Sequence, residues 1–352
     1  MVPDALTPHD PRVTHHFTTI PSTSHTTESI TYHYLLANPN STSFSNGQPT
    51  GTVLLLHGWP DLSLGWRYQV PFLLSLGLRV IIPDMLGYGL TSSPASPTEY
   101  SLKKLSSHLA HIIREVTTTS STKKPERVLL GAHDWGAFLG WRLAIYFPQL
   151  IKGIFAFCIP YTPPETKVTT LEEHVRKHPE LGYQLQNAGG GIERVVGEDK
   201  KKLRGWLNAM FGGLSEDTGV MAFDPWKGLD LDKLEEVEAS PLVGEEVVDF
   251  LWYEYSRNGI QGPMNWYRTR EINLQDELPL AEEYATWQFQ VPAMIVMVGH
   301  DPALPPTLTD GMEKYFAKGL RKEVIPEASH WVLIHTPEEV NKLVGEFLEQ
   351  FL

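Results

Sequence analysis

Short apolar segments that alternate with helical segments constrain the fold of this chain more than any other feature of its sequence. Apolar runs typical of buried strands occur at residues 52–56, 80–84, 127–132 and 151–159. Residues 100–116 and 137–147 lie between these runs and read as helices. Residues 13–20 and 29–37 read as two further extended segments. Strands that alternate with helices predict an α/β fold with a mostly parallel central sheet flanked by helices.

The alternation stops between residues 161 and 290, where helical and aromatic-rich segments replace the apolar strands. It resumes at residues 291–298 and 322–325, and a last helix is expected over residues 337–351. A core interrupted by an inserted helical cap explains this change. We therefore predict four parts: an N-terminal extension (1–28), a first core part (29–160), the helical cap (161–290) and a second core part (291–352).

Composition and charge exclude several classes of partner. The chain has 352 residues and a formal net charge of −13, which argues against nucleic acid and anionic membrane surfaces as partners. No apolar stretch approaches the roughly 20 residues of a membrane span. The N-terminal residues lack the basic start and apolar run of a secretory signal, so a cytoplasmic protein is expected. The only cysteine, Cys158, leaves no intramolecular disulfide.

The segment GAHDWG at residues 131–136 carries the strongest signal for chemistry. Many α/β enzymes place a nucleophile on a sharp turn between a strand and a helix, where only small flanking residues fit. Ala132 and Gly136 are the small flanks here, and Asp134 takes the place of the nucleophile. A carboxylate is ionised at neutral pH and can attack an sp³ carbon to give an alkyl ester. An aspartate that only caps the following helix would give the same short pattern.

Hydrolysis of such an ester requires a general base, most often a histidine oriented by a carboxylate. The chain has 14 histidines, so their order along the chain selects among them. The acid and then the histidine follow the nucleophile, each after a late strand. Asp301 follows the run at residues 291–298 and His330 follows the run at residues 322–325, so we predict a triad with Asp134, and Glu165 as the reserve acid.

The segment HGWP at residues 57–60 fits an oxyanion hole. The backbone N–H groups of Trp59 and Trp135 would hold the negative charge that develops when water attacks the ester. A simple turn at the end of a strand would also explain this segment. His57 and His133 are interpreted as structural residues.

Together these residues resemble the epoxide hydrolases of the α/β-hydrolase fold from about residue 28 to the end of the chain. The motifs that carry the resemblance are HGWP (57–60), PDMLGYG (83–89), GAHDWG (131–136), HD (300–301) and SHW (329–331). Two cap segments add to it: ELGYQL contains Tyr183 and NWYR contains Tyr267. Leu86, where this family commonly has a basic residue, and His300 before the acid depart from the pattern.

The resemblance implies a cofactor-free and metal-free conversion of a small apolar or aromatic epoxide and water into a vicinal diol. Asp134 would open the ring while Tyr183 and Tyr267 assist the departing oxygen, and His330 with Asp301 would then activate water. The oligomeric state is left open. One alternative is a haloalkane dehalogenase with the same triad, since Trp135 also fits that family, although Trp59 stands where those enzymes often have asparagine. Another alternative is a non-catalytic binding protein on the same fold.

Overall fold

The computed structural model describes residues 3–21, 29–40, 48–118, 123–197, 199–284 and 286–352. The predicted N-terminal extension lies partly outside these ranges, at residues 1, 2 and 22–28. Two compact units are found. The first contains residues 1–85, 102–163 and 282–352, and the second contains residues 86–101 and 164–281. The second unit therefore includes residues 86–101 in addition to most of the predicted cap, and the predicted boundaries of the four parts stay a prediction.

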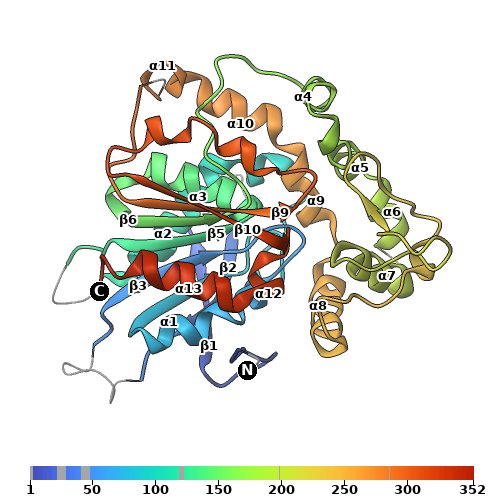
Figure 1. Cartoon of the computed structure of the whole chain (residues 1–352), viewed down its shortest axis with the longest axis horizontal. Coiled ribbons are helices and arrows are strands. Elements are labelled where there is room, and N and C mark those ends of the chain that lie inside the picture. The colour runs from blue at the N-terminus through green and yellow to red at the C-terminus, as the bar shows by residue number, and fades with distance from the viewer. Residues whose placement is uncertain (1–2, 22–28, 41–47, 119–122, 198, 285) are drawn as a thin grey trace. The chain divides into compact units, whose positions relative to one another are not determined.

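The first unit is built on an eight-stranded sheet with the order β1-β2-β4-β3-β5-β6-β9-β10 (Figure 1). Its strands are β1 (Val13–Ile20), β2 (Ile30–Ala37), β3 (Gly51–Leu56), β4 (Leu78–Pro83), β5 (Val128–His133), β6 (Ile151–Phe157), β9 (Ala293–His300) and β10 (Leu320–Ser329). Strands β1 and β2 are antiparallel to their neighbours, and every pairing from β4 to β10 is parallel. The prediction of an α/β fold with a mostly parallel sheet is confirmed.

Burial along the strands follows their place in the sheet. All six residues of β3 and all six of β5 are buried, as expected for central strands covered on both faces. The edge strand β1 instead exposes several of its side chains, including Phe17. This strand lies in the predicted N-terminal extension and forms the outer edge of the sheet.

Helices pack on this sheet through apolar faces. They are α1 (Gln69–Ser75), α2 (Leu102–Thr117), α3 (Trp135–Tyr146), α12 (Val332–His335) and α13 (Pro337–Leu348), with η2 (Ser63–Trp66) before α1. A short helix, α11 (Ala281–Tyr284), precedes β9 in the sequence. Leu105, Leu109 and Ile112 bury one face of α2, the side predicted from their spacing. Helix α1 packs against α13 and α2 against α3 (Figure 1).

The second unit is mainly helical. Its elements are η3 (Pro97–Tyr100), α4 (Leu171–Lys177), α5 (Tyr183–Ala188), α6 (Gly191–Val196), α7 (Lys200–Met210), α8 (Glu245–Asn258), α9 (Gln261–Asn265), η7 (Trp266–Arg268) and α10 (Arg270–Glu277). A small hairpin of β7 (Phe223–Asp224) and β8 (Gly228–Leu229) had no signal in the sequence, because two-residue strands show no periodicity. Within the described ranges, no helix combines the length and apolar character needed to cross a membrane.

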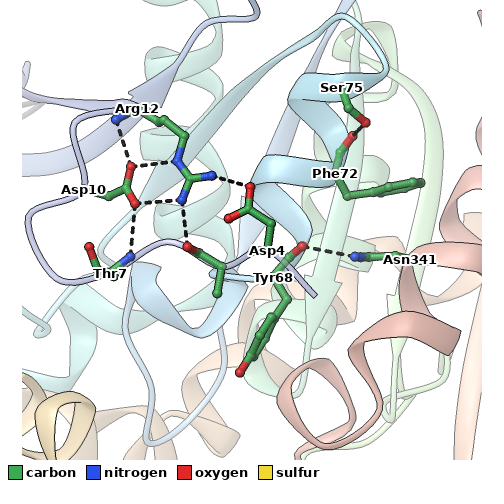
Figure 2. A network of polar contacts seen from close by, with 9 residues as sticks. Asp4, Thr7, Asp10, Arg12, Tyr68, Phe72, Ser75 and Asn341 are labelled. Carbon is green, nitrogen blue, oxygen red and sulfur yellow. Dashed lines mark hydrogen bonds and ion pairs between the residues drawn. The ribbon is translucent and has the colours of Figure 1, made fainter. Parts of the chain in front are cut away.

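Arg12 organises the segment that precedes β1 (Figure 2). Its guanidinium donates to both carboxylate oxygens of Asp10 at 2.8 Å, to Asp4 at 2.6 Å and to the carbonyl oxygen of Ala5 at 2.7 Å. The hydrogen bonds from the Arg12 side chain are the main reason that the pKa of Asp10 lies well below its usual range. Leu6 adds a backbone hydrogen bond to Arg67 before α1, so this segment is fixed to the sheet domain.

We expect Arg12→Gln to release the segment before β1. The substitution removes charged hydrogen bonds to a buried carboxylate, which should lower the free energy of unfolding by about 1 to 3 kcal/mol. Chemical denaturation would measure this loss, and limited proteolysis would show new cleavage near residues 3–12. Lys233→Gln, which breaks an ion pair between exposed side chains, is the matched control and should change neither.

Candidate active site

Asp134 lies at the sharp turn between β5 and α3. Its φ of +52° and ψ of −126° belong to a region that residues with a side chain rarely adopt, so packing around the turn must hold it there. At the flank after Asp134 there is no room for a larger residue than glycine. A Cβ atom on Gly136 would come within 2.5 Å of the carbonyl oxygens of Leu56 and His57. The predicted tight turn with small flanks is therefore present, and helix α3 begins directly against the end of β3.

The carboxylate of Asp134 is bound by backbone N–H groups. The N–H of Trp59 donates to its Oδ1 at 2.7 Å, and the N–H of Trp135 also contributes a hydrogen bond. Asp134 occupies the position before α3, but its side chain makes no capping hydrogen bond to that helix of the usual kind, which would come from the second or third helical residue. Burial raises the pKa of Asp134, while the charge of His330 and the two N–H groups oppose that rise.

His330 and Asp301 complete the group around Asp134. The Nδ1 atom of His330 lies 2.6 Å from Asp301 Oδ2, and its Nε2 atom lies 3.6 Å from Asp134 Oδ2. Burial lowers the pKa of His330, but the carboxylate of Asp301 outweighs burial and keeps that pKa well above 6.5. Burial likewise acts to raise the pKa of Asp301, yet the charge and hydrogen bond of His330 hold it below its usual value.

The structure thus brings together the three residues that the order of motifs selected. Asp301 directly follows β9, and His330 directly follows β10. These strands are neighbours in the sheet, so their carboxyl ends present both side chains to the end of β5. Glu165, the reserve acid, is placed differently: it lies in the second unit and forms a 3.0 Å ion pair with Arg270.

His57 and His133 hold the backbone of the site. The Nε2 atom of His57 accepts from the N–H of Met85 at 3.0 Å, so its Nδ1–H donates to the carbonyl oxygen of Gly58 at 2.9 Å. This fixes the Gly58–Trp59 peptide, whose N–H points to Asp134. The Nε2–H of His133 donates to the carbonyl oxygen of His330 at 2.9 Å. Burial lowers the pKa values of His57 and His133 to about 4 and about 3, which keeps both rings neutral.

Three nearby residues escaped the reasoning from sequence. Gly58 packs directly on the nucleophile turn, since a Cβ atom there would lie 2.4 Å from the Cβ of Asp134. Asp61 is buried one residue after the HGWP segment, and burial raises the pKa of its carboxyl to about 7. Cys158, with a φ of +67°, brings its sulfur to 3.5 Å from the carbonyl oxygen of His330. The HGWP motif could have pointed to Gly58, and the apolar run at residues 151–159 predicted that Cys158 is buried. The burial of Asp61 and the contact of Cys158 with His330 have no signal in the sequence.

One group of side chains could in principle hold a metal ion. Among the residues that the structure describes, His133, Cys158 and His330 offer ligand atoms within 4.8 Å of one another. Two of them already donate to the carbonyl oxygen of His330, and the imidazole of His330 is bound to Asp301. The arrangement is accounted for by these hydrogen bonds, and the absence of a metal requirement stays a prediction.

Tyr183 and Tyr267 are neighbours in the second unit. Their ring centroids lie 5.8 Å apart at an interplanar angle of 76°. Tyr183 is the first residue of α5 and is half-buried, whereas Tyr267 lies in η7 and is buried. The structure therefore pairs the two tyrosines that the cap motifs selected.

We expect Gly58→Ala to disturb the turn around Asp134 without changing the sheet. The new methyl group would overlap the Asp134 side chain and must displace it or the Trp59 N–H, at a cost of about 1 to 3 kcal/mol in stability. Thermal unfolding would measure the cost. Gly51→Ala is the control, because the nearest atom to its added Cβ, Leu78 Cδ2, lies at 3.4 Å; an equal loss in both variants would contradict the assignment.

Comparison with known proteins agrees with this geometry. Residues 53–343 match the "Alpha/beta hydrolase family". The chain is 79% identical to "Epoxide hydrolase srdG" of Neurospora crassa over the full length of both, and 28% identical to "Epoxide hydrolase A" of Mycobacterium tuberculosis over 86% of this chain and 92% of that protein. The crystal structure of epoxide hydrolase A from Mycobacterium thermoresistibile superposes with a TM-score of 0.74 and 26% identity, covering 95% of this chain and 98% of that one.

Proposed function

Because this chain is an epoxide hydrolase of the α/β-hydrolase family, we propose that it opens its substrate through a covalent ester on Asp134. The observation that carries the proposal is the arrangement around this carboxylate. One oxygen accepts the Trp59 N–H, and the other lies 3.6 Å from the imidazole of His330. The two oxygens are thus suited to different tasks in one cycle.

In the first step, Asp134 Oδ2 attacks a carbon of the epoxide ring. The bond from that carbon to the ring oxygen breaks, and its electron pair remains on the oxygen. Tyr183 and Tyr267 donate hydrogen bonds to this oxygen, and a proton from one phenol prevents the release of a free alkoxide. The product of this step is an alkyl ester of Asp134.

In the second step, His330 accepts a proton from water at Nε2 while Asp301 holds the ring through Nδ1. The resulting hydroxide attacks Cγ of Asp134, and the negative charge builds on Oδ1. The N–H groups of Trp59 and Trp135 stabilise that charge. The Cγ–Oδ2 bond then breaks, the departing oxygen takes the proton from His330, and the diol leaves with Oδ2. Asp134 keeps the oxygen of water as a carboxylic acid, which loses its proton to solvent and becomes a carboxylate again. The phenolate left by the first step regains a proton from solvent, so the cycle is closed.

Further properties of the enzyme belong to the same proposal. We expect a small apolar or aromatic epoxide as substrate, supported by the aromatic character of residues 161–290. A cytoplasmic location also stays a prediction. The alternatives of a haloalkane dehalogenase and a non-catalytic binding protein lose their support, since the chain is 79% identical to an epoxide hydrolase over its full length.

Replacement of the base should trap the ester. We expect His330→Gln, incubated with a panel of aromatic and alkyl epoxides, to gain the mass of one whole epoxide, with the adduct on Asp134 by peptide mapping. Asp134→Ala should form no diol and no adduct. His300→Gln is the matched control, because His300 is exposed and adjoins Asp301. This variant should convert the epoxides to diols at the normal rate. An adduct on another residue, or turnover by Asp134→Ala, would contradict the covalent scheme.

The pH dependence of the second step should report on His330. Only the neutral imidazole accepts a proton from water, so hydrolysis of the ester should slow as the pH falls through the pKa of His330. Asp301 raises this pKa, so Asp301→Asn should move the acidic limb to lower pH as well as slowing the reaction. Single-turnover quench experiments followed by mass spectrometry would measure the profile. An unshifted limb in Asp301→Asn would show that another group titrates.

A further inference from the structure

Three consecutive glycines, residues 189–191, separate the body of α5 from that of α6. Helix α5 starts at Tyr183, so the conformation of this connection helps to decide where the Tyr183 phenol lies. Gly190 adopts a φ of +76°, a conformation that glycine enters without steric cost. Three glycines in a row have little intrinsic stiffness, and the chain alone does not fix the angle between the two helices.

Arg268, the residue after Tyr267, contacts both sides of this glycine connection. Its Nε donates to the carbonyl oxygen of Ala188 at 2.9 Å, just before the glycines. One terminal nitrogen pairs with the carboxylate of Glu193, just after them. The other terminal nitrogen donates to Asn265 Oδ1 at 2.9 Å. One guanidinium thus connects α5 and α6 to the segment that carries Tyr267.

The segment that contains Tyr267 is itself held firmly within the second unit. Asn265 is fully buried and donates from Nδ2 to the carbonyl oxygen of Ala95 at 3.1 Å. The indole N–H of Trp266 donates to the carbonyl oxygen of Leu86 at 3.0 Å. The segment that contains Tyr267 is therefore a fixed point within the second unit, against which Arg268 holds the more flexible connection.

Other contacts place α5 against the β7–β8 hairpin instead. Gln186 exchanges two hydrogen bonds with the backbone of Leu229, at 2.7 and 2.8 Å, and the N–H of Tyr183 donates to the carbonyl oxygen of Pro225 at 3.0 Å. These bonds orient the helix relative to the hairpin. The hydrogen bond from Arg268 to Ala188 connects the last residue of α5 to the segment that contains Tyr267.

We infer that Arg268 is a positioning residue that sets the spacing between the Tyr183 and Tyr267 phenols by clamping the glycine connection. The inference rests on the proposed function, in which both phenols serve one oxygen atom. Two donors that converge on one atom tolerate little error, and a displacement of about 1 Å can reduce the rate by roughly 100-fold. The planar guanidinium suits this task because its donors have fixed directions, which a lysine ammonium lacks.

The decisive experiment measures the two steps separately. In the His330→Gln background, the rate of ester formation should fall roughly 10- to 100-fold when Arg268→Gln is added. Hydrolysis of the ester is measured in the single variant Arg268→Gln, after the ester has formed in one turnover. Its rate should not change, because hydrolysis does not use the tyrosines as donors. A residue that only stabilises the fold would not affect one step selectively. Equal rates of ester formation with and without Arg268→Gln would overturn the inference.

Two controls separate geometry from charge. Among the residues that the structure describes, none donates a hydrogen bond to the second, buried carboxylate oxygen of Glu193, so loss of Arg268 also leaves a buried charge uncompensated. The double variant Arg268→Gln/Glu193→Gln removes that charge and should remain slow in the first step; recovery of the normal rate would overturn the inference. Arg204→Gln, which breaks a more exposed ion pair with Asp249 in the same unit, should leave both steps unchanged.

Stiffening the connection should compensate for the lost clamp. A Cβ atom on Gly191 would find only ordinary contact, with Leu231 Cδ1 at 3.8 Å, so Gly191→Ala fits. We expect Gly191→Ala to restore part of the ester-formation rate in the Arg268→Gln variant. If the variant is folded, as judged by circular dichroism, and the rate of ester formation is not restored, the flexible glycine connection is not the cause of the slow first step.

The outcomes also distinguish this inference from the function on which it rests. Failure of His330→Gln alone to form any ester would contradict the proposed covalent mechanism. Normal ester formation by His330→Gln that is insensitive to Arg268→Gln would contradict the clamp alone. If Arg268→Gln does not fold, Glu193→Gln removes one contact of the clamp and should slow ester formation several-fold; an unchanged rate in that variant would then overturn the inference.

Discussion

A carboxylate buried at the end of β5 is the constraint on which the rest of the core depends. Burial acts against its charge, and the charge of His330 together with oriented hydrogen-bond donors close by opposes that effect. The donors are backbone N–H groups, which cannot be placed by rotating a side chain. They require the loop after β3 to approach the turn so closely that residue 58 has no space for a Cβ atom. The close packing of these two loops therefore determines where the N–H groups that stabilise the charge of Asp134 lie.

The parallel sheet makes this arrangement possible. Strands β3, β5, β9 and β10 all run in the same direction, so the segments after their carboxyl ends share one edge of the sheet. Those segments contain Trp59, Asp134, Asp301 and His330. Buried neutral histidines then fix the backbone on either side of Asp134: His57 binds the peptide that supplies the Trp59 N–H, and His133 binds the carbonyl oxygen of His330. Their burial favours the neutral ring, which can donate and accept through different nitrogens.

The sequence was sufficient for those features that repeat along the chain or follow a fixed order. Apolar runs separated by helices predicted the mostly parallel sheet, and the order of Asp134, Asp301 and His330 after successive strands selected residues that the structure brings together. The catalytic roles of these residues stay predictions. Burial of Asp61 and the contact of Cys158 with His330 depend on packing between distant segments, so neither produces a local pattern. Arg268 stood in the NWYR motif, but its link to the glycine connection became visible only when Ala188 and Glu193 were placed around it.

In the proposed cycle, the first step prepares the second through charge. In the resting site His330 lies between two carboxylates, Asp301 and Asp134, and its raised pKa favours the protonated ring. Formation of the ester removes the charge of Asp134, so a carboxylate 3.6 Å from Nε2 of His330 no longer attracts the imidazolium. The imidazole then loses a proton more readily and becomes a base at the moment when water must be activated. The nucleophile and the base are thus coupled over 3.6 Å, and the site needs no separate switch to change from ring opening to hydrolysis.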